Sequence, residues 1–236
     1  MQRLVRQSLS AARWMLFLLL LLPLCAQGQR TIKPELYIGA KAGATLSFMS
    51  FSPSITQRIL PGFTAGAVVR YAEENIFGII GELSIAQRGW RENYPNGEPF
   101  SYSRTLTYIQ IPFMAHIRFG SDKFKGFVNL GPEVGYMLGS KISANFDYKN
   151  IGSVEGYPQG YRTNKQLDMA INSKFDYGIV GGLGAEWRFL PKQAVTIEGR
   201  FYFGLGNIFS ATKKDYFSAS RTMSVEITAA WMFRIK

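Results

Sequence analysis

Residues Phe175–Phe189, FDYGIVGGLGAEWRF, decide the fold of this chain because alternate residues form two incompatible surfaces. The odd-numbered residues are aromatic, aliphatic or small, whereas the even-numbered ones are mainly glycine or charged, with Asp176, Glu186 and Arg188 among them. Only a β-strand, whose side chains alternate with a period of two, separates residues in this way. The stretch is therefore predicted to be a strand with one apolar and one polar face.

The same alternation recurs in seven further segments, and no charged residue stands on any of the eight apolar faces. The predicted strands are residues 35–48, 62–71, 77–88, 104–119, 124–138, 175–190, 194–206 and 221–235. Charge-free faces on strands of this length are typical of a transmembrane β-barrel in a Gram-negative outer membrane. We therefore predict an all-β fold, an eight-stranded antiparallel up-and-down transmembrane β-barrel formed by residues 29–236.

A soluble lipocalin-like barrel is the alternative, because alternation alone does not say which face points inward. The polar faces are rich in glycine, which weakens a solvated strand but suits the narrow lumen of a small barrel. Aromatic residues also gather at the strand ends, where membrane barrels carry their girdles. Both features favour the membrane barrel.

The connections between the predicted strands alternate in length. Those at 72–76, 120–123 and 191–193 are short, and those at 49–61, 89–103, 139–174 and 207–220 are long. Because outer-membrane barrels have short periplasmic turns and long extracellular loops, both termini are predicted to be periplasmic. The predicted periplasmic girdle comprises Tyr71, Phe77, Phe119, Phe124, Trp187, Phe189, Trp231 and Phe233. The predicted outer girdle comprises Phe48, Phe63, Tyr136, Phe175 and Tyr177.

Pro112 and Pro132 stand inside two of the predicted strands. A closed barrel has no free edge to accommodate a residue that lacks an N–H donor. We therefore predict a local β-bulge at each proline, which would leave one residue unpaired while the strand continues.

The N-terminal segment predicts export. Three arginines precede the short apolar run Met15–Leu22, and small residues ahead of Gln29 form a cleavage site. Residues 1–28 are thus predicted to be a signal peptide, and the cell outer membrane is the predicted location. A lipoprotein signal that uses Cys25 is the alternative, although Leu24 is the wrong size for the position before such a cysteine. Cleavage ahead of Gln29 would leave no cysteine for a disulfide, a nucleophile or a metal site.

Charged residues of both signs stand on the faces that are predicted to point inward. They are Arg70, Glu82, Arg88, Arg118, Glu133, Asp176, Glu186, Arg188, Glu198, Arg200, Glu226 and Arg234. An unpaired charge in a narrow lumen is costly, so we expect these side chains to pair across neighbouring strands. A salt-bridged interior that fixes strand register is favoured over an ion or proton pathway, because eight-stranded barrels are usually filled by side chains.

Sequence signals for catalysis or cofactor binding are weak. The single histidine, His116, is predicted to point inward near the periplasmic end, which suits a hydrogen-bonded lumen residue better than a general base. No metal-ligand spacing, phosphate-binding loop or nucleophile motif stands in the sequence. The formal net charge of +11 comes from basic residues that are spread over polar strand faces and loops, which favours contact with anionic lipid over nucleic acid. We expect no enzyme activity, no cofactor, no metal and no nucleic-acid partner.

The two longest predicted loops, 89–103 and 139–174, carry aromatic residues among polar ones. Loops of such length are usually functional or disordered. The candidate contact residues for a ligand or partner are Trp90, Tyr94, Tyr148, Tyr157 and Tyr161. The alternative is a cap that shields lipopolysaccharide, for which basic residues such as Lys149, Arg162 and Lys165 would contact lipid A phosphates. Loop composition leaves both hypotheses open.

Four stretches resemble outer-membrane β-barrel domain proteins of the porin-family, or PorT-like, type, and the similarity covers essentially the mature chain. They are YIQIPFMAHIRF (Tyr108–Phe119), FVNLGPEVGYML (Phe127–Leu138), FDYGIVGGLGAEWRF (Phe175–Phe189) and EGRFYFGLGNIF (Glu198–Phe209). The resemblance implies an eight-stranded barrel. Because PorT belongs to the type IX protein secretion machinery, the resemblance also implies an accessory role in protein secretion.

Three functions from different classes follow from these features. A non-enzymatic structural or interaction barrel, whose extracellular loops form the contact surface, is favoured. A narrow porin-like channel for ions or small solutes is the alternative, and an enzyme at the extracellular rim comes third. The expected partners are outer-membrane lipid and lipopolysaccharide together with a secretion or envelope protein, and the barrel is expected to be monomeric.

Overall fold

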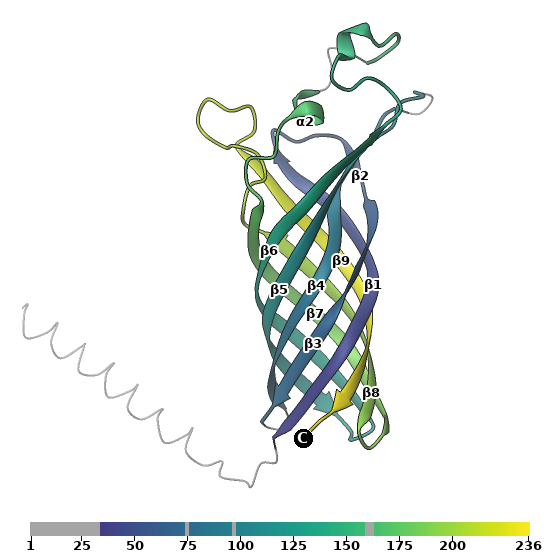
Figure 1. The fold of residues 1–236 in the computed structure, drawn as a ribbon, viewed down its shortest axis with the longest axis vertical. Helices are drawn as coiled ribbons and strands as arrows, with labels where there is room; N and C mark the ends of the chain where they lie inside the picture. Colours follow the sequence, from purple (N-terminus) through teal and green to yellow (C-terminus); the bar gives the residue numbers. More distant parts are fainter. Residues whose placement is uncertain (1–33, 74–75, 96–97, 159–162) are drawn as a thin grey trace, which may run out of the picture. The chain divides into compact units, whose positions relative to one another are not determined.

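The computed structural model describes residues 34–73, 76–95, 98–158 and 163–236 (Figure 1). The predicted signal peptide lies outside these ranges. The strands are β1 (Glu35–Ser52), β2 (Gln57–Arg58), β3 (Leu60–Ala72), β4 (Phe77–Glu92), β5 (Tyr102–Gly120), β6 (Phe124–Ala144), β7 (Phe175–Leu190), β8 (Gln193–Gly204) and β9 (Ala219–Arg234). Two short helical segments, η2 (Ile151–Ser153) and α2 (Lys165–Asp168), lie between β6 and β7.

Eight long strands close into a ring in which each strand pairs antiparallel with its neighbours in the chain. Pairing of β1 with β9 and of β4 with β5 completes the circuit. The two-residue strand β2 adds to the outer end of β4 and brings the strand total to nine. The predicted eight-stranded antiparallel barrel is therefore confirmed, with β2 as an addition that the sequence did not indicate.

Alternation along each strand follows the predicted division of faces. In β5, for example, Ile111 and Phe113 are exposed on the outer surface, whereas Gln110 and His116 are buried in the lumen. Aromatic rings near both ends of the barrel are exposed on its outer surface, as the two predicted girdles require. Figure 1 shows the long connections at one end of the barrel and the C-terminus at the other. The described residues form no helix that has both the length and the apolar character needed to cross a membrane.

The strands β4, β5 and β6 are longer than the predicted ranges 77–88, 104–119 and 124–138. Beyond those ranges their outward residues are polar, as Arg91 and Ser103 are, so the membrane pattern ends although the hydrogen-bonded ladder continues. The loops are correspondingly shorter than predicted. Three strands of the barrel wall therefore extend into the extracellular space.

The bulges predicted at Pro112 and Pro132 are absent from the described ladders. Pro112 faces Glu133 and Pro132 faces Ile179 without any shift of register at either proline. Instead, the ladder between β4 and β5 is interrupted beside Pro112, where the pairs between Gly81–Phe113 and Ser84–Gln110 are missing. Because proline has no N–H to donate, the strands lose pairing locally and keep their register.

Glycines on the inward faces do more than leave space in the lumen. They also allow neighbouring strands to approach each other closely. A Cβ atom built on Gly43 would collide with the carbonyl oxygen of Ile227 in β9, and one built on Gly131 would collide with the carbonyl oxygen of Phe113 in β5. Larger residues at these positions would push adjacent backbones apart, so glycine allows the wall to curve tightly.

Candidate functional site

A layer of ion pairs fills the middle of the lumen. Arg200, on β8, donates from both terminal nitrogens to the carboxylate of Glu82 on β4, with each pair of atoms 2.8 Å apart. Its guanidinium also contacts Glu198 at 2.7 Å, and Lys41 of β1 donates to Glu82 at 2.5 Å. All four side chains are almost completely buried. Bidentate, charge-assisted pairs of this kind fix geometry as well as charge.

A second layer lies on the extracellular side of the first. Arg88 donates to Glu133 at 2.7 Å and to Glu226 at 3.1 Å. Its guanidinium carbon lies 4.0 Å from the ring centroid of Tyr202, which places the cation over an aromatic face. Gln110 also donates to Glu226, at 3.3 Å. Side chains from five strands, three of them charged, therefore meet at this level.

A third group of charges closes the periplasmic end. Arg70 donates to Glu186, and its guanidinium carbon lies 4.3 Å from the ring centroid of Tyr37. The carboxylate of Glu35 is contacted by Arg118 at 3.0 Å, by Arg234 at 3.2 Å and by Arg188 at 3.5 Å. We call the three groups together the lumen network. Its members come from all eight long strands of the barrel.

The structure brings the predicted lumen charges together, with one exception. Within the described ranges Asp176 forms no ion pair, although its side chain is buried at the extracellular end of the lumen. Two members of the network, Lys41 and Glu35, were not among the predicted charges. Lys41 stands on an inward face of the predicted first strand, so the alternation of inward and outward residues could have identified it as a lumen charge.

His116 lies where the sequence predicts, buried in the lumen. Its Nδ1 atom is 2.7 Å from Oδ1 of Asn129, and its ring centroid lies 5.1 Å from that of Phe127. Asn129 in turn donates to Glu198 at 2.8 Å, which connects the histidine to the lumen network. The lumen cavity beside these residues has a volume of about 20 Å³. Such a space holds about one water molecule.

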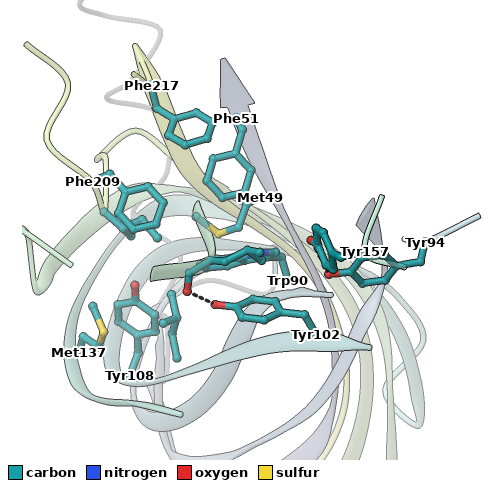
Figure 2. Close-up of a cluster of buried hydrophobic side chains, with 13 residues drawn as sticks. Met49, Phe51, Trp90, Tyr94, Tyr102, Tyr108, Met137, Tyr157, Phe209 and Phe217 are labelled. Atoms are coloured by element: carbon teal, nitrogen blue, oxygen red, sulfur yellow. Dashed lines mark hydrogen bonds between the residues drawn. The ribbon is translucent and has the colours of Figure 1, made fainter. Parts of the chain in front are cut away.

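Above the ion pairs, buried apolar side chains close the extracellular mouth, and we call them the mouth cluster. They are Met49, Phe51, Trp90, Tyr94, Tyr102, Leu106, Tyr108, Met137, Tyr157, Leu167, Ile208, Phe209 and Phe217. Figure 2 shows Trp90 across the centre of the group, with Tyr94 and Tyr157 beside one another at its edge. The ring centroid of Phe51 lies 5.4 Å from that of Trp90 and 5.1 Å from that of Phe217. Strands and three loops thus share one apolar core.

The short helix α2 is seated in this mouth. Leu167 is fully buried, and its carbonyl oxygen accepts a hydrogen bond of 2.7 Å from the hydroxyl of Tyr102, drawn as a dashed line in Figure 2. Arg104 donates to the carbonyl oxygen of Met169, also at 2.7 Å. The side chain of Gln166 donates to Glu92 at 3.1 Å. The loop between β6 and β7 is therefore anchored to the barrel wall through both side chains and main-chain oxygens.

The candidate contact aromatics are placed differently from the expectation. Trp90 lies in β4 rather than in a loop and is fully buried, while Tyr94 and Tyr157 are buried with their hydroxyl oxygens 3.3 Å apart. Tyr148 is half-buried against Tyr102. Burial of large apolar area favours packing of these rings over exposure to water. Tyr161 lies outside the described residues.

The loop between β8 and β9 is held by a carboxylate. The Ser210 and Thr212 hydroxyls donate to Asp215 at 2.6 Å each, and the Thr212 N–H donates at 2.7 Å. These hydrogen bonds lower the pKa of Asp215 below its usual range, because they stabilise the charged form. Among the residues that the structure describes, no group of His, Cys, Asp and Glu side chains is arranged to hold a metal ion.

Comparison with known proteins adds family and fold. A family model described as "Outer membrane protein beta-barrel domain" matches residues 25–210. Similar solved structures include Ail of Yersinia pestis in complex with the heparin analogue sucrose octasulfate, at 14% identity and a TM-score of 0.42, over 84% of this chain and 99% of Ail. OprG from Pseudomonas aeruginosa is 9% identical with a TM-score of 0.47, over 86% of this chain and 94% of OprG. A search among curated proteins finds no match.

The family match extends over much more than half of the chain and includes all but the last strand and part of the preceding loop. It agrees with the closed antiparallel ring and with the exposed apolar outer face. The protein therefore belongs to the outer membrane protein beta-barrel domain family and is located in the outer membrane.

Proposed function

We propose that this protein is a sealed, non-enzymatic outer-membrane barrel whose extracellular end serves as a contact surface for a partner. The observation that carries the proposal is that the barrel is closed twice, once inside the lumen and once at its extracellular mouth. The lumen network occupies the interior with paired charges, and the mouth cluster covers the interior on the extracellular side. A barrel with both closures would meet a partner at its extracellular surface rather than in its interior.

The packing of aromatic rings at the extracellular end supports a role in recognition. The loop rings Tyr94, Phe100, Phe146 and Tyr157 pack on one another, with centroid distances from 5.1 to 6.1 Å. Because these rings pack on one another before any partner arrives, less conformational entropy is lost on binding. The exposed side chains around the packed rings are then the ones available to a partner.

The resemblance to PorT-like proteins narrows the proposal to an accessory role in protein secretion. The partner would then be a protein of the secretion machinery or another envelope protein. Electrical recording on purified protein in planar bilayers tests the sealed barrel. We expect no steady conductance, and ohmic steps of nanosiemens size would overturn the proposal.

Cross-linking in intact cells tests the contact surface. A photoreactive residue replaces Lys149, which is exposed in the extracellular loop, and a matched variant carries it at Lys192 in a periplasmic turn. We expect a discrete cross-linked protein from position 149 that is absent from position 192. Equal capture from both positions, or none from position 149, would contradict an extracellular contact surface.

A narrow transport channel is the second candidate, and the polar side chains that line the lumen favour it. Deleting residues 146–172 separates the two functions, because β6 and β7 stay intact while α2 is removed. An interaction protein should lose its cross-linked partner and stay electrically silent. A channel that the loop closes should gain steady conductance.

A further inference from the structure

Four side chains form a straight row across the extracellular extension of the barrel wall, and we call them the arginine–serine row. Arg58 of β2 stands directly opposite Arg91 of β4, Arg91 stands opposite Ser103 of β5, and Ser103 stands opposite Ser143 of β6. Cross-strand partners project on the same face of a sheet. With neighbouring strands about 4.8 Å apart, the row extends over roughly 14 Å.

The two arginines stand in an arrangement that is unfavourable without a ligand. Like charges directly opposite each other destabilise a strand pair, and β2 pairs with β4 through two residues alone. Both arginines are exposed, and neither forms an ion pair with any residue that the structure describes. Arg58 uses its Nε to donate to Asn93 at 2.6 Å, which orients the guanidinium and leaves its terminal nitrogens for another acceptor.

The row lines a groove of about 490 Å³. Ligand pockets commonly have volumes of roughly 300–1,000 Å³. Glu98 and Phe100 also line the groove, so its wall offers a carboxylate acceptor and an aromatic ring in addition to the guanidinium and hydroxyl donors. Guanidinium groups bind phosphate and carboxylate in bidentate fashion, while hydroxyls and a carboxylate suit sugar hydroxyls. A sugar that carries an anionic group matches this set of partners.

The height of the row determines which molecules reach it. Ser103 is six residues beyond Ile109, which pairs with the girdle residue Tyr136, and this corresponds to roughly 20 Å along the strand. The groove therefore opens outside the aromatic girdle, at the level of lipid head groups and sugars rather than acyl chains. The upper ends of β5 and β6 extend beyond the rest of the barrel in Figure 1.

We propose that this groove binds an anionic saccharide, with Arg58 and Arg91 holding its phosphate or carboxylate and with Ser103 and Ser143 holding its hydroxyls. The inference deepens the proposed function by naming the chemistry of one contact, and it rests on that function only in requiring that the extracellular end meets ligands. Two sources supply this chemistry, namely lipopolysaccharide of the same leaflet and a soluble glycan.

The test compares the double variant Arg58→Gln/Arg91→Gln with Lys213→Gln/Lys214→Gln, which removes two exposed charges from a different extracellular loop. Each barrel is placed in nanodiscs. One arm incorporates intact lipopolysaccharide in the disc, and the other adds deacylated lipopolysaccharide to discs that contain none. Bound saccharide is measured in both arms, and heat-dependent gel mobility verifies that every variant is folded.

We expect the double arginine variant to bind at least about tenfold more weakly, because two charge-assisted contacts are lost. The lysine variant should change binding by less than about twofold, because its charges lie away from the groove. A deficit confined to the intact lipid assigns the leaflet as source, and a deficit with the deacylated molecule assigns a soluble glycan. Equal binding by both variants in both arms would overturn the proposal, as would no binding at all, which an acidic protein partner would give.

A second variant, Ser103→Ala/Ser143→Ala, keeps the charge and removes the hydroxyls. We expect it to weaken binding by about fivefold, the typical effect of losing such hydrogen bonds. Wild-type affinity in this variant would contradict recognition of the sugar hydroxyls. A conducting barrel that still binds saccharide through the row would overturn the proposed function and leave this inference standing, so the two fail separately.

Discussion

The lumen and the outer face of the extracellular extension use arginine in opposite ways. In the lumen, Arg88 and Arg200 are buried, contact two carboxylates each, and Arg88 also lies over an aromatic ring. On the outer face, Arg58 and Arg91 are exposed, face each other across strands, and form no ion pair with the described residues. Among the described residues, carboxylates pair with the first set of charges and not with the second.

This difference separates structure from recognition. A buried charge without a partner costs several kcal/mol, so the lumen arginines can persist only with their carboxylates in place. An exposed arginine remains hydrated and has no such requirement. The buried arginines therefore serve to hold the barrel together, whereas the exposed Arg58 and Arg91 are available to bind another molecule.

The largest loss of stability that separates the lumen arginines from the exposed ones should come from Arg200→Met. The substitution leaves the buried carboxylates of Glu82 and Glu198 without their shared partner, so we expect the free energy of unfolding to fall by about 3–5 kcal/mol. Urea unfolding of the refolded barrel, followed by tryptophan fluorescence, measures the change. Arg91→Met is the matched control and should fall within about 0.5 kcal/mol of the wild type. Similar losses in both variants would erase the distinction between the two regions.

A second effect compares the two faces of a single strand. Ile111 is exposed to lipid in mid-strand, and Ile111→Lys should cost about 2–4 kcal/mol because a charge enters the hydrocarbon region. The adjacent lumen residue Gln110, changed to Asn, should cost about 1 kcal/mol through one weakened hydrogen bond. Unfolding midpoints in liposomes distinguish the two values. A costlier change at Gln110 would mean that the assignment of faces is reversed.

A smaller, local effect concerns the mouth cluster. Leu167→Ala removes about 2 kcal/mol of packing that anchors α2, so the loop should open more often while the barrel keeps its unfolding midpoint. Cleavage by trypsin after Lys149 should become about thirtyfold faster. Asp168→Ala, at an exposed position of the same helix, should leave the cleavage rate unchanged. If Leu167→Ala lowers the midpoint instead, the loop and the barrel unfold as one unit.

The smallest effect is pH dependence of the loop between β8 and β9. Because the pKa of Asp215 is lowered, its hydrogen bonds with Ser210 and Thr212 hold at neutral pH and are lost as pH falls through that lowered pKa. Hydrogen exchange of the Thr212 amide should accelerate, relative to a neighbouring loop amide, in acid only. Asp215→Asn should show the fast exchange already at neutral pH. An unchanged rate in that variant would mean that other contacts hold the turn.

Strand identity and facing were predictable because period-two alternation is local. The pairing partners within the lumen were not, since Arg70 and Glu186 are 116 residues apart and meet only through the stagger of the closed barrel. Burial of Trp90 escaped prediction because the outward neighbours of that stretch are polar, so the membrane pattern stops where the strand does not. The arginine–serine row escaped as well, because the two residues of β2 are too few to show any periodicity.

The way in which α2 is held has a consequence for how this sequence tolerates change. Two of its anchoring hydrogen bonds end on the carbonyl oxygens of Leu167 and Met169, atoms that every amino acid supplies. The outward positions Lys165 and Asp168 can therefore diverge, or accept a grafted peptide, without loss of those anchors. The outward residues of this loop can therefore be exchanged at the extracellular end of the barrel, because the main-chain hydrogen bonds that anchor the loop do not depend on their identity.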